Sequence, residues 1–193
     1  MPSQNRRERE RASRHELILR TARELAETEG WDAVTTRRLS ERIEYSQPVL
    51  YSHFAGKDAI IGAVAMQGFA ELADALASAR AQAGGEQAVV AAVIRTYLAF
   101  AGANPALYDA MFTLSTDLPF AQATTPAPMQ AGFAQLHRVL APLAGGHDTG
   151  VFTELWWATL HGLVTLARGG RIPADAQEQR LAMLVDMLTS PAR

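Results

Sequence analysis

The chain has 193 residues, of which 48% are hydrophobic, and it contains no cysteine. This length suits one domain, or a small domain joined to a larger one. The absence of thiols excludes disulfides, thiolate metal sites and cysteine nucleophiles. The N-terminus has no apolar stretch that would form a secretory signal, and no run of about 18 apolar residues marks a membrane span. We therefore expect a cytoplasmic protein with no membrane partner.

Charge is distributed unevenly, although the net charge is only −2. Residues 1–58 hold 11 Lys and Arg against 10 Asp and Glu, a sum of +1, whereas residues 59–193 hold 7 against 10, a sum of −3. Residues 1–14 alone contain five Arg and two Glu. A basic end on an acidic body is typical of a DNA-binding head. A solvated basic tail would give the same counts.

Helices are predicted along the whole chain, because Ala, Leu, Glu, Gln and Arg dominate and strand-like alternation is scarce. Gly, Pro and capping Thr or Ser residues divide the chain into about nine helices. In chain order they are expected at about 14–29, 36–43, 47–53, 57–82, 86–101, 105–114, 128–143, 149–168 and 173–189. Residues 115–128 are expected to form a loop, and Asn104 is expected to cap the sixth helix.

Two short helices near the N-terminus are separated by a turn of about three residues, Glu44 to Ser46. Thr35 and Ser46 stand where N-cap residues belong. This spacing is typical of a helix-turn-helix, whose second helix enters the major groove of DNA. That second helix is too short and too weakly apolar to serve a core, so we expect it to contact base edges and phosphates.

Several side chains of this head suit contacts with DNA. Gln47 can pair with adenine or bind a phosphate, and Pro48 and Val49 offer apolar contact to a thymine methyl. Hydroxyl, imidazole and cationic groups around them suit phosphates. The candidate DNA contacts are Thr35, Thr36, Arg37, Arg38, Ser46, Gln47, Pro48, Val49, Tyr51, His53 and Lys57. A core aromatic at Tyr51 and a plain surface lysine at Lys57 are the alternatives.

The stretch GWDAVTTRRLSERIEYSQPVLYSHFAGKDAII resembles the head of TetR-type regulators. Those regulators show a capping Thr, a short helix, a turn, then Leu-Tyr-x-x-Phe and a Lys-Asp/Glu pair. The positions in step are Thr35, Leu39, Ser46, Leu50, Tyr51, Phe54, Lys57 and Asp58. The family usually has a glycine in the turn, where this chain has Glu44. The turn must therefore be formed by Glu44 at a conformational cost, or by a different geometry. Gln47 and Pro48 also depart from the usual residues.

The arginines near the N-terminus, Arg6, Arg7, Arg9 and Arg11, resemble the flexible arms that some members of the family place in a minor groove. A solvated tail is the alternative.

The second part of the chain is rich in aromatic residues and Met. One explanation is a cavity for an apolar or aromatic small-molecule effector. The candidate ligand contacts are Tyr97, Phe100, Tyr108, Met111, Phe112, Phe133, His137, Trp157 and His161. An ordinary core plus a dimer interface is the alternative.

The segment WWATLHGLVTLARGG resembles a Trp-x-x-x-His-Gly signature of one TetR subgroup, at Trp157, His161 and Gly162. The resemblance implies a homodimer formed by the last two helices, and therefore a palindromic operator. Their apolar stripes are Leu155, Leu160 and Leu163, and Leu181, Leu184 and Leu188. These stripes would alternatively close the core of a single subunit.

The resemblance implies an all-α protein with a three-helix DNA-binding domain over residues 1–58 and a helical bundle for effector binding and dimerisation over 59–193. Its expected function is that of a repressor released from DNA by a small molecule. Two alternatives are a dimeric DNA-binding regulator without a ligand and a helical ligand-binding protein without DNA affinity. No GxSxG, HExxH, phosphate loop or paired metal-ligand spacing occurs in the sequence, so no enzyme activity, cofactor or metal is expected.

Overall fold

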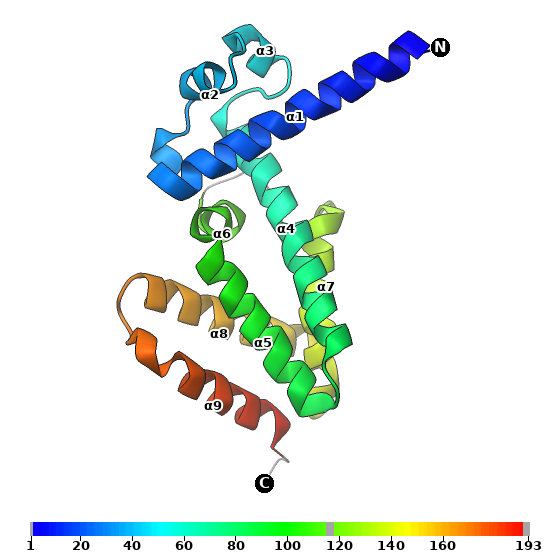
Figure 1. Ribbon diagram of the computed structural model, residues 1–193. Coiled ribbons are helices and arrows are strands. Elements are labelled where there is room, and N and C mark those ends of the chain that lie inside the picture. The colour runs from blue at the N-terminus through cyan, green and yellow to red at the C-terminus, as the bar shows by residue number, and fades with distance from the viewer. Residues whose placement is uncertain (1, 115–117, 191–193) are drawn as a thin grey trace. The chain divides into compact units, whose positions relative to one another are not determined.

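The computed structural model describes residues 2–114 and 118–190, and within these ranges every regular element is a helix (Figure 1). This confirms the predicted all-α class. The α-helices of the described residues are α1 (Pro2–Glu29), α2 (Thr36–Arg42), α3 (Gln47–Tyr51), α4 (Lys57–Gln82), α5 (Glu86–Ala103), α6 (Pro105–Phe112), α7 (Ala127–Leu140), α8 (Thr149–Arg168) and α9 (Gln177–Thr189). Short 3₁₀ helices lie at Trp31–Ala33, Ala141–Leu143 and Ala174–Ala176.

The first helix is longer than predicted, because it begins at Pro2 and not near Arg14. Arg6 donates to Glu10 at 2.9 Å, and Arg14 lies 3.9 Å from the same carboxylate. Such i,i+4 pairs stabilise the N-terminal part of this helix, which has no apolar stripe. The expectation of a flexible arm is therefore wrong for the described part of this segment. In the expected loop, residues 115–117 lie outside the described residues.

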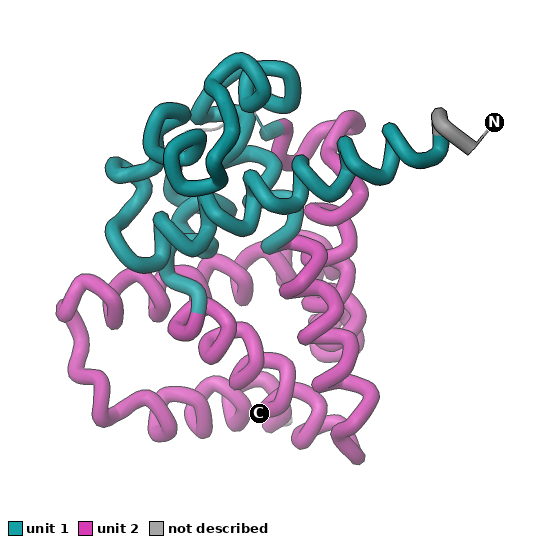
Figure 2. The backbone as a smooth tube through the Cα atoms, turned by 45° about the horizontal axis from the view of Figure 1, so that its top comes forward, with its two compact units in different colours: residues 1–68, 104–118 teal, residues 69–103, 119–193 magenta. Residues whose placement is uncertain are grey.

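The chain forms two compact units (Figure 2). We call residues 1–68 and 104–118 the head unit, and residues 69–103 and 119–193 the body unit. The helix α4 begins in the head unit and continues into the body unit. The helix α6, although it follows α5 in the chain, belongs to the head unit.

The head unit has its own apolar core. Ile18 and Leu25 of α1, Leu39 of α2 and Leu50 of α3 are at most 1% exposed. Ile18 and Leu25 are seven residues apart, so they share one face of α1. Phe54, which follows α3, is 6% exposed and belongs to this core. This core fixes α3 relative to α1.

In the body unit, α5 packs against α7, α8 and α9. Four of the leucines assigned to dimer stripes, Leu160, Leu181, Leu184 and Leu188, are at most 7% exposed within the single chain. They close the core of the body unit, so the prediction that they face a partner subunit is wrong. Leu155, by contrast, is 63% exposed.

One helix of the described residues, α4, is long and apolar enough to cross a membrane, with a mean hydropathy of 1.4 over its most apolar 18 residues. The bent pair of α5 and α6 passes the same test only when the two are taken together. Half of the α4 window is buried inside the structure. Its side chains Ile60, Val64 and Leu76 are at most 1% exposed. A helix whose apolar face is already covered by its own chain is a core helix, and we interpret α4 in this way.

Candidate DNA interface

The predicted helix-turn-helix is formed by α2 and α3 of the head unit. Thr35 caps α2, since its Oγ1 accepts a hydrogen bond from the N–H of Arg38 at 3.2 Å. This confirms the predicted N-cap. Ser46 holds the N-cap position of α3 without a side-chain cap bond. Leu39 of α2 and Leu50 of α3 attach the two helices to the core of the head unit.

The turn between the two helices is formed by Glu44, whose φ is 57°. This confirms the first of the two turn geometries considered for this position. The surrounding backbone stays hydrogen-bonded, because the N–H of Ile43 donates to Leu39 O and the N–H of Tyr45 to Ser40 O, both at 3.0 Å. A side chain in the left-handed region costs roughly 1–2 kcal/mol. The head therefore keeps the turn geometry without the glycine that favours it.

The free face of α3 carries polar side chains. Gln47 and Pro48 are exposed, and Tyr51 is 54% exposed. Gln47 and Tyr51 are four residues apart and so lie on the same side of the helix. The hydroxyl of Tyr51 lies 3.5 Å from Thr36 Oγ1 on α2. Tyr51 is thus not a core aromatic, and its hydroxyl lies beside a second hydroxyl. Val49 is half-buried.

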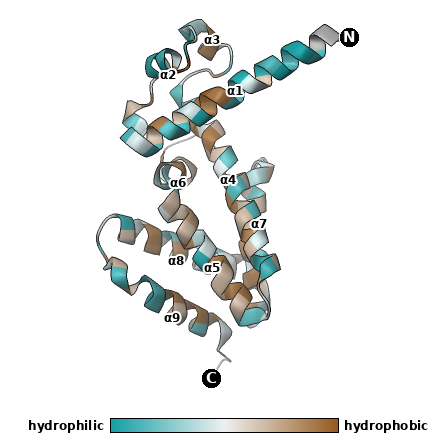
Figure 3. Ribbon diagram, in the orientation of Figure 1, coloured by the Kyte–Doolittle hydropathy of each residue, from teal (hydrophilic) through white to brown (hydrophobic). Residues whose placement is uncertain are grey.

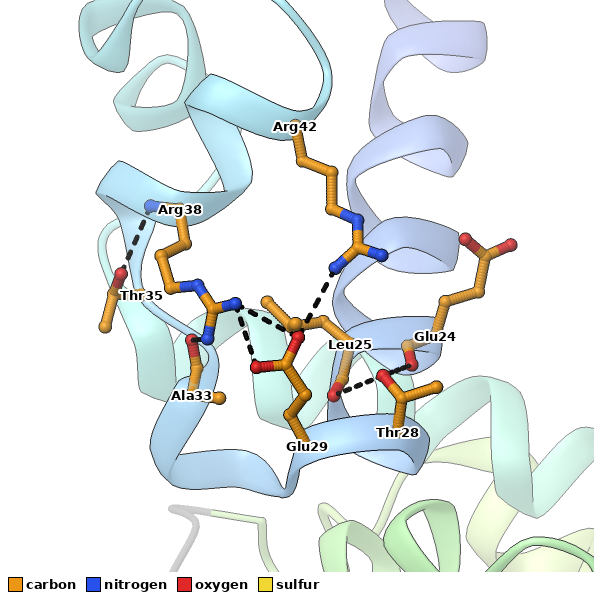
Figure 4. Close-up of polar contacts among 8 residues, drawn as sticks. All are labelled: Glu24, Leu25, Thr28, Glu29, Ala33, Thr35, Arg38 and Arg42. Carbon is orange, nitrogen blue, oxygen red and sulfur yellow. Dashed lines mark hydrogen bonds and ion pairs between the residues drawn. The ribbon is translucent and has the colours of Figure 1, made fainter.

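Two arginines of α2, Arg38 and Arg42, are engaged within the head unit (Figure 4). Arg38 donates to both carboxylate oxygens of Glu29, at 2.9 and 3.0 Å, and Arg42 lies 3.8 Å from the same carboxylate. These contacts attach α2 to the C-terminal end of α1. Arg37 pairs with Glu41 at 2.9 Å on the exposed side of α2, where its own side chain is 79% exposed. Of these three arginines, Arg37 is the most accessible to an outside partner.

Lys57 also has a partner within the head unit. Its Nζ donates to the backbone oxygen of Trp31 at 2.6 Å, and its side chain is half-buried. This bond ties the start of α4 to the 3₁₀ turn that follows α1. A phosphate contact by Lys57 would therefore compete with a bond that holds the head together.

The N-terminal half of α1 meets the C-terminal end of α3. Arg11 Nη2 donates to Ser52 O at 3.4 Å, and the ring of His15 stacks on Phe54 with centroids 4.5 Å apart. The rings of His15 and His53 are 6.1 Å apart. Burial lowers the pKa of His53, and the charges of Arg11, His15 and Arg14 lower it further. The neutral imidazole is thus favoured at a position where we expect DNA contact.

The helix α6 is attached to α1 by a carboxylate that the sequence did not single out. Glu27 accepts from the backbone N–H groups of Ala106 and Leu107, at 3.0 Å each. Trp31 Nε1 donates to Ala106 O at 2.7 Å. Asn104, the expected cap of α6, makes no side-chain cap bond; its Oδ1 accepts from Arg23 at 2.9 Å. Asn104 thus holds the predicted N-cap position without a cap bond, and Glu27 satisfies the N-terminus of α6 in its place.

Four predicted ligand contacts come together in the body unit. Trp157 Nε1 donates to the hydroxyl of Tyr97 at 3.1 Å, and Phe133 meets Trp157 edge to face with centroids 6.4 Å apart. The ring of His137 is 6.3 Å from that of Phe133, and its Nε2 lies 3.2 Å from Thr149 Oγ1. These residues form one aromatic cluster from α5, α7 and α8.

The remaining candidates are divided between the two units. Phe100 and His161 are half-buried in the body unit, and burial lowers the pKa of His161. Tyr108, Met111 and Phe112 lie on α6 of the head unit, where Tyr108 and Met111 are 1% exposed. Within the described residues no group of three or more His, Asp or Glu is placed to hold a metal ion.

A small apolar cavity lies in the body unit, with a volume of about 10 Å³. Side chains from α5, α7, α8 and α9 line it, among them Ile94, Leu136, Trp156 and Leu160. None of the predicted ligand contacts lines this cavity. It has room for about one water molecule, so this cavity is too small for a small-molecule effector.

A helix-turn-helix with an exposed polar second helix, joined to an all-α body, defines the class of helix-turn-helix regulatory proteins. Residues 18–64 match the profile described as bacterial regulatory proteins, tetR family, and residues 90–188 match the tetracyclin repressor-like C-terminal domain. The chain therefore belongs to the TetR family. This confirms the family resemblance and, since the family consists of transcription regulators, the expectation that the protein is not an enzyme.

Individual relatives agree with this assignment over shorter ranges. The chain is 32% identical over 94 residues to an uncharacterized HTH-type transcriptional regulator, YobS, of Bacillus subtilis, covering 49% of each chain. It is 48% identical over 50 residues to the tetracycline repressor protein class C of Escherichia coli, covering 26% of this chain and 23% of that protein. The chain thus spans about half or less of these relatives. A solved structure of a protein of unknown function from Rhodococcus sp. RHA1 covers 90% of this chain and 92% of its own, with a TM-score of 0.74 and 25% identity.

Proposed function

We propose that the protein is a cytoplasmic, dimeric transcriptional repressor that binds a palindromic operator through α3 and is released by a small-molecule effector. The observation that carries this proposal is the capped α2–turn–α3 unit with its polar, exposed outer face. A short helix that buries few of its own residues contributes little to a core, but it fits a major groove. Membership of a family of regulators gives this geometry its function.

The proposed DNA contacts fall into two groups. Gln47, Pro48 and Val49 at the start of α3 meet base edges, because the N-terminus of a recognition helix enters the groove first. Hydroxyl, imidazole and guanidinium groups around them meet phosphates. This second group is Thr35, Thr36, Arg37, Ser46, Tyr51 and His53. Arg38 and Lys57 support DNA binding indirectly, by holding the head unit together, because each makes a hydrogen bond within it.

The proposed effector site is the aromatic cluster of the body unit, Tyr97, Phe133, His137 and Trp157. Aromatic walls with a few polar groups suit an apolar or aromatic ligand. The Trp157-x-x-x-His161-Gly162 signature belongs to this proposal, since the Trp157 indole is bonded to Tyr97 within the cluster.

A second candidate is a dimeric regulator without a small ligand. The cavity of about 10 Å³ favours it, since ligand pockets usually measure about 300–1,000 Å³. A thermal-shift screen with apolar and aromatic compounds distinguishes the two. A compound that raises the melting temperature and releases DNA supports the effector-responsive repressor, because a ligand that binds only the folded state stabilises it. If no compound of a broad set releases the protein from DNA, the regulator without a small ligand is favoured.

The proposed dimer forms through the faces of α8 and α9 that the single chain leaves uncovered. Val151 and Leu155 are each 63% exposed, and Met183 and Met187 are 57% and 69% exposed. Each of these pairs is spaced i,i+4, so each forms one apolar stripe on its helix. Large apolar side chains grouped in this way mark an interaction surface.

A mobility-shift titration with DNA from upstream of the gene tests the function. The wild-type protein should bind with sequence preference and a steep dependence on salt. Tyr51→Ala should weaken binding about tenfold or more with little change in melting temperature, because Tyr51 is exposed. Phe120→Ala, at an exposed aromatic outside the helix-turn-helix, is the matched control and should leave binding unchanged. An absence of binding at low salt, with shuffled DNA as control, contradicts the proposal.

A further inference from the structure

A stripe of arginines runs along the N-terminal half of α1. Arg7, Arg11 and Arg14 are spaced i,i+4,i+7 and therefore share one face of the helix. All three are exposed. The next residue on this face is Ile18, which is fully buried in the core of the head unit. The arginine stripe therefore lies on the same face of α1 as the core residue Ile18, but nearer to the N-terminus, where the helix is exposed.

This stripe begins where the exposed face of α3 ends. Arg11 donates to Ser52 O, at the C-cap of α3, and Ser52 itself is exposed. In Figures 1 and 2 the N-terminal turns of α1 extend past the helix-turn-helix within the head unit. Figure 3 shows the same turns as hydrophilic. The step of seven positions from Arg7 to Arg14 corresponds to about 10 Å of helix. The stripe therefore prolongs the surface of α3 with positive charge.

Two further arginines, Arg6 and Arg9, lie on the other side of this helix. Arg6 is paired with Glu10 at 2.9 Å, and Arg9 Nε donates to Asn5 O at 3.1 Å. Within the described residues Arg7 makes no hydrogen bond or ion pair of its own, and the nearest carboxylate to Arg14 is 3.9 Å away. Within the described residues, Arg7 and Arg11 of the stripe thus have no carboxylate partner, whereas Arg14 shares Glu10 with Arg6.

We propose that Arg7, Arg11 and Arg14 form a rigid helical phosphate-binding stripe, which contacts the DNA backbone flanking the base pairs read by α3. This inference rests on the proposed DNA-binding function. In this proposal the N-terminal segment contacts DNA with one face of a helix, and not as a flexible arm. Two adjacent DNA-facing elements with a fixed mutual position would set the register of the head on the duplex.

Salt dependence of binding tests this stripe. A duplex selected by the wild-type protein from a random pool is the probe, and Arg7→Gln/Arg14→Gln is compared with Arg6→Gln/Arg9→Gln. Both double variants remove two positive charges from the same helix. Each lost phosphate contact lowers the slope of log K against log salt by about 0.9. The stripe variant should therefore lose about 1.8 per head, and the control less than half of that.

Shortening the duplex gives an independent readout. When base pairs outside those read by α3 are removed, the wild-type slope should fall by about 2.7 per head, because three phosphate contacts are lost, whereas the slope of the stripe variant, which keeps Arg11, should fall by about 0.9. Equal slope losses in the two double variants would overturn the inference, because the position of the charge on the helix would then not matter. No loss in the stripe variant would overturn it as well, because these arginines would then make no phosphate contact. If the wild-type protein selects no duplex at all, the proposed function itself fails. Circular dichroism of both variants checks that α1 remains helical.

Discussion

At the scale of single residues, the turn of the helix-turn-helix contains a strained position. Replacing Glu44 by glycine should relieve roughly 1–2 kcal/mol of left-handed strain and lose roughly 0.5–1 kcal/mol through the greater freedom of glycine in the unfolded chain. We expect Glu44→Gly to raise the free energy of unfolding by about 0.5–1 kcal/mol in a urea titration. Glu44→Ala is the control, since it removes the charge but keeps the Cβ. An equal gain from Glu44→Ala would show that charge, not backbone strain, is the cause.

A second residue-scale prediction concerns His53, whose pKa is lowered mainly by burial and also by Arg11, His15 and Arg14. The unfolded chain then binds a proton more readily than the folded chain, so stability falls as pH drops through about 6.5, the usual value for histidine. His53→Gln should flatten this loss between about pH 7 and 5. Urea unfolding at several pH values measures it. The slope should not vanish, because burial lowers the pKa of His161 in the same direction.

The control for this pH dependence is His147→Gln, at an exposed histidine of the loop before α8. The acid slope of that variant should match the wild-type slope. If His53→Gln and His147→Gln flatten the profile equally, the environment of His53 is not responsible for it.

At the scale of elements, the attachment of α6 to α1 depends on one carboxylate. Glu27→Gln keeps the shape of the side chain but offers one acceptor to the two N–H groups of Ala106 and Leu107. Charged hydrogen bonds contribute about 1.5–3 kcal/mol, and a carboxylate also complements the positive end of a helix. We expect a loss of about 1–2 kcal/mol in urea unfolding. The control is Glu24→Gln, at an exposed residue of the same helix 3.9 Å from Arg20. Equal losses would contradict the capping role of Glu27.

The elements that could be predicted are those whose signal is local. The cap at Thr35 and the spacing of the core residues Leu39 and Leu50 are sufficient to predict the helix-turn-helix. The extension of α1 to Pro2 has no such signal, because its arginines and glutamates form no apolar stripe. The Glu27 cap of α6 joins residues 79 and 80 positions apart, and no periodicity reports a contact of that range. Nor could sequence patterns tell which leucines of α8 and α9 are buried.

At the scale of the whole molecule, the proposed dimer would determine how the proposed operator is read. Leu155→Asp/Met187→Asp places two charges on the proposed interface of α8 and α9, where an unpaired carboxylate cannot be buried without a large cost. We expect monomers in size-exclusion chromatography and sedimentation at concentrations where the wild-type protein is dimeric. The circular dichroism of the variant should remain that of a folded helical protein, because both side chains are exposed in the single chain, while its melting temperature should lose only the part that dimerisation contributes.

The same variant separates dimerisation from DNA reading. A palindromic site gains affinity from two linked heads, because the second head then binds at a high effective concentration. The monomeric variant should therefore lose about 100-fold or more on the full operator, yet bind an isolated half-site as the wild-type head does. Phe120→Asp, which adds a charge at an exposed aromatic before α7, should leave both properties unchanged. A Leu155→Asp/Met187→Asp protein that stays dimeric would place the interface elsewhere on the body unit. A monomer that keeps full operator affinity would instead show that the two heads do not bind cooperatively.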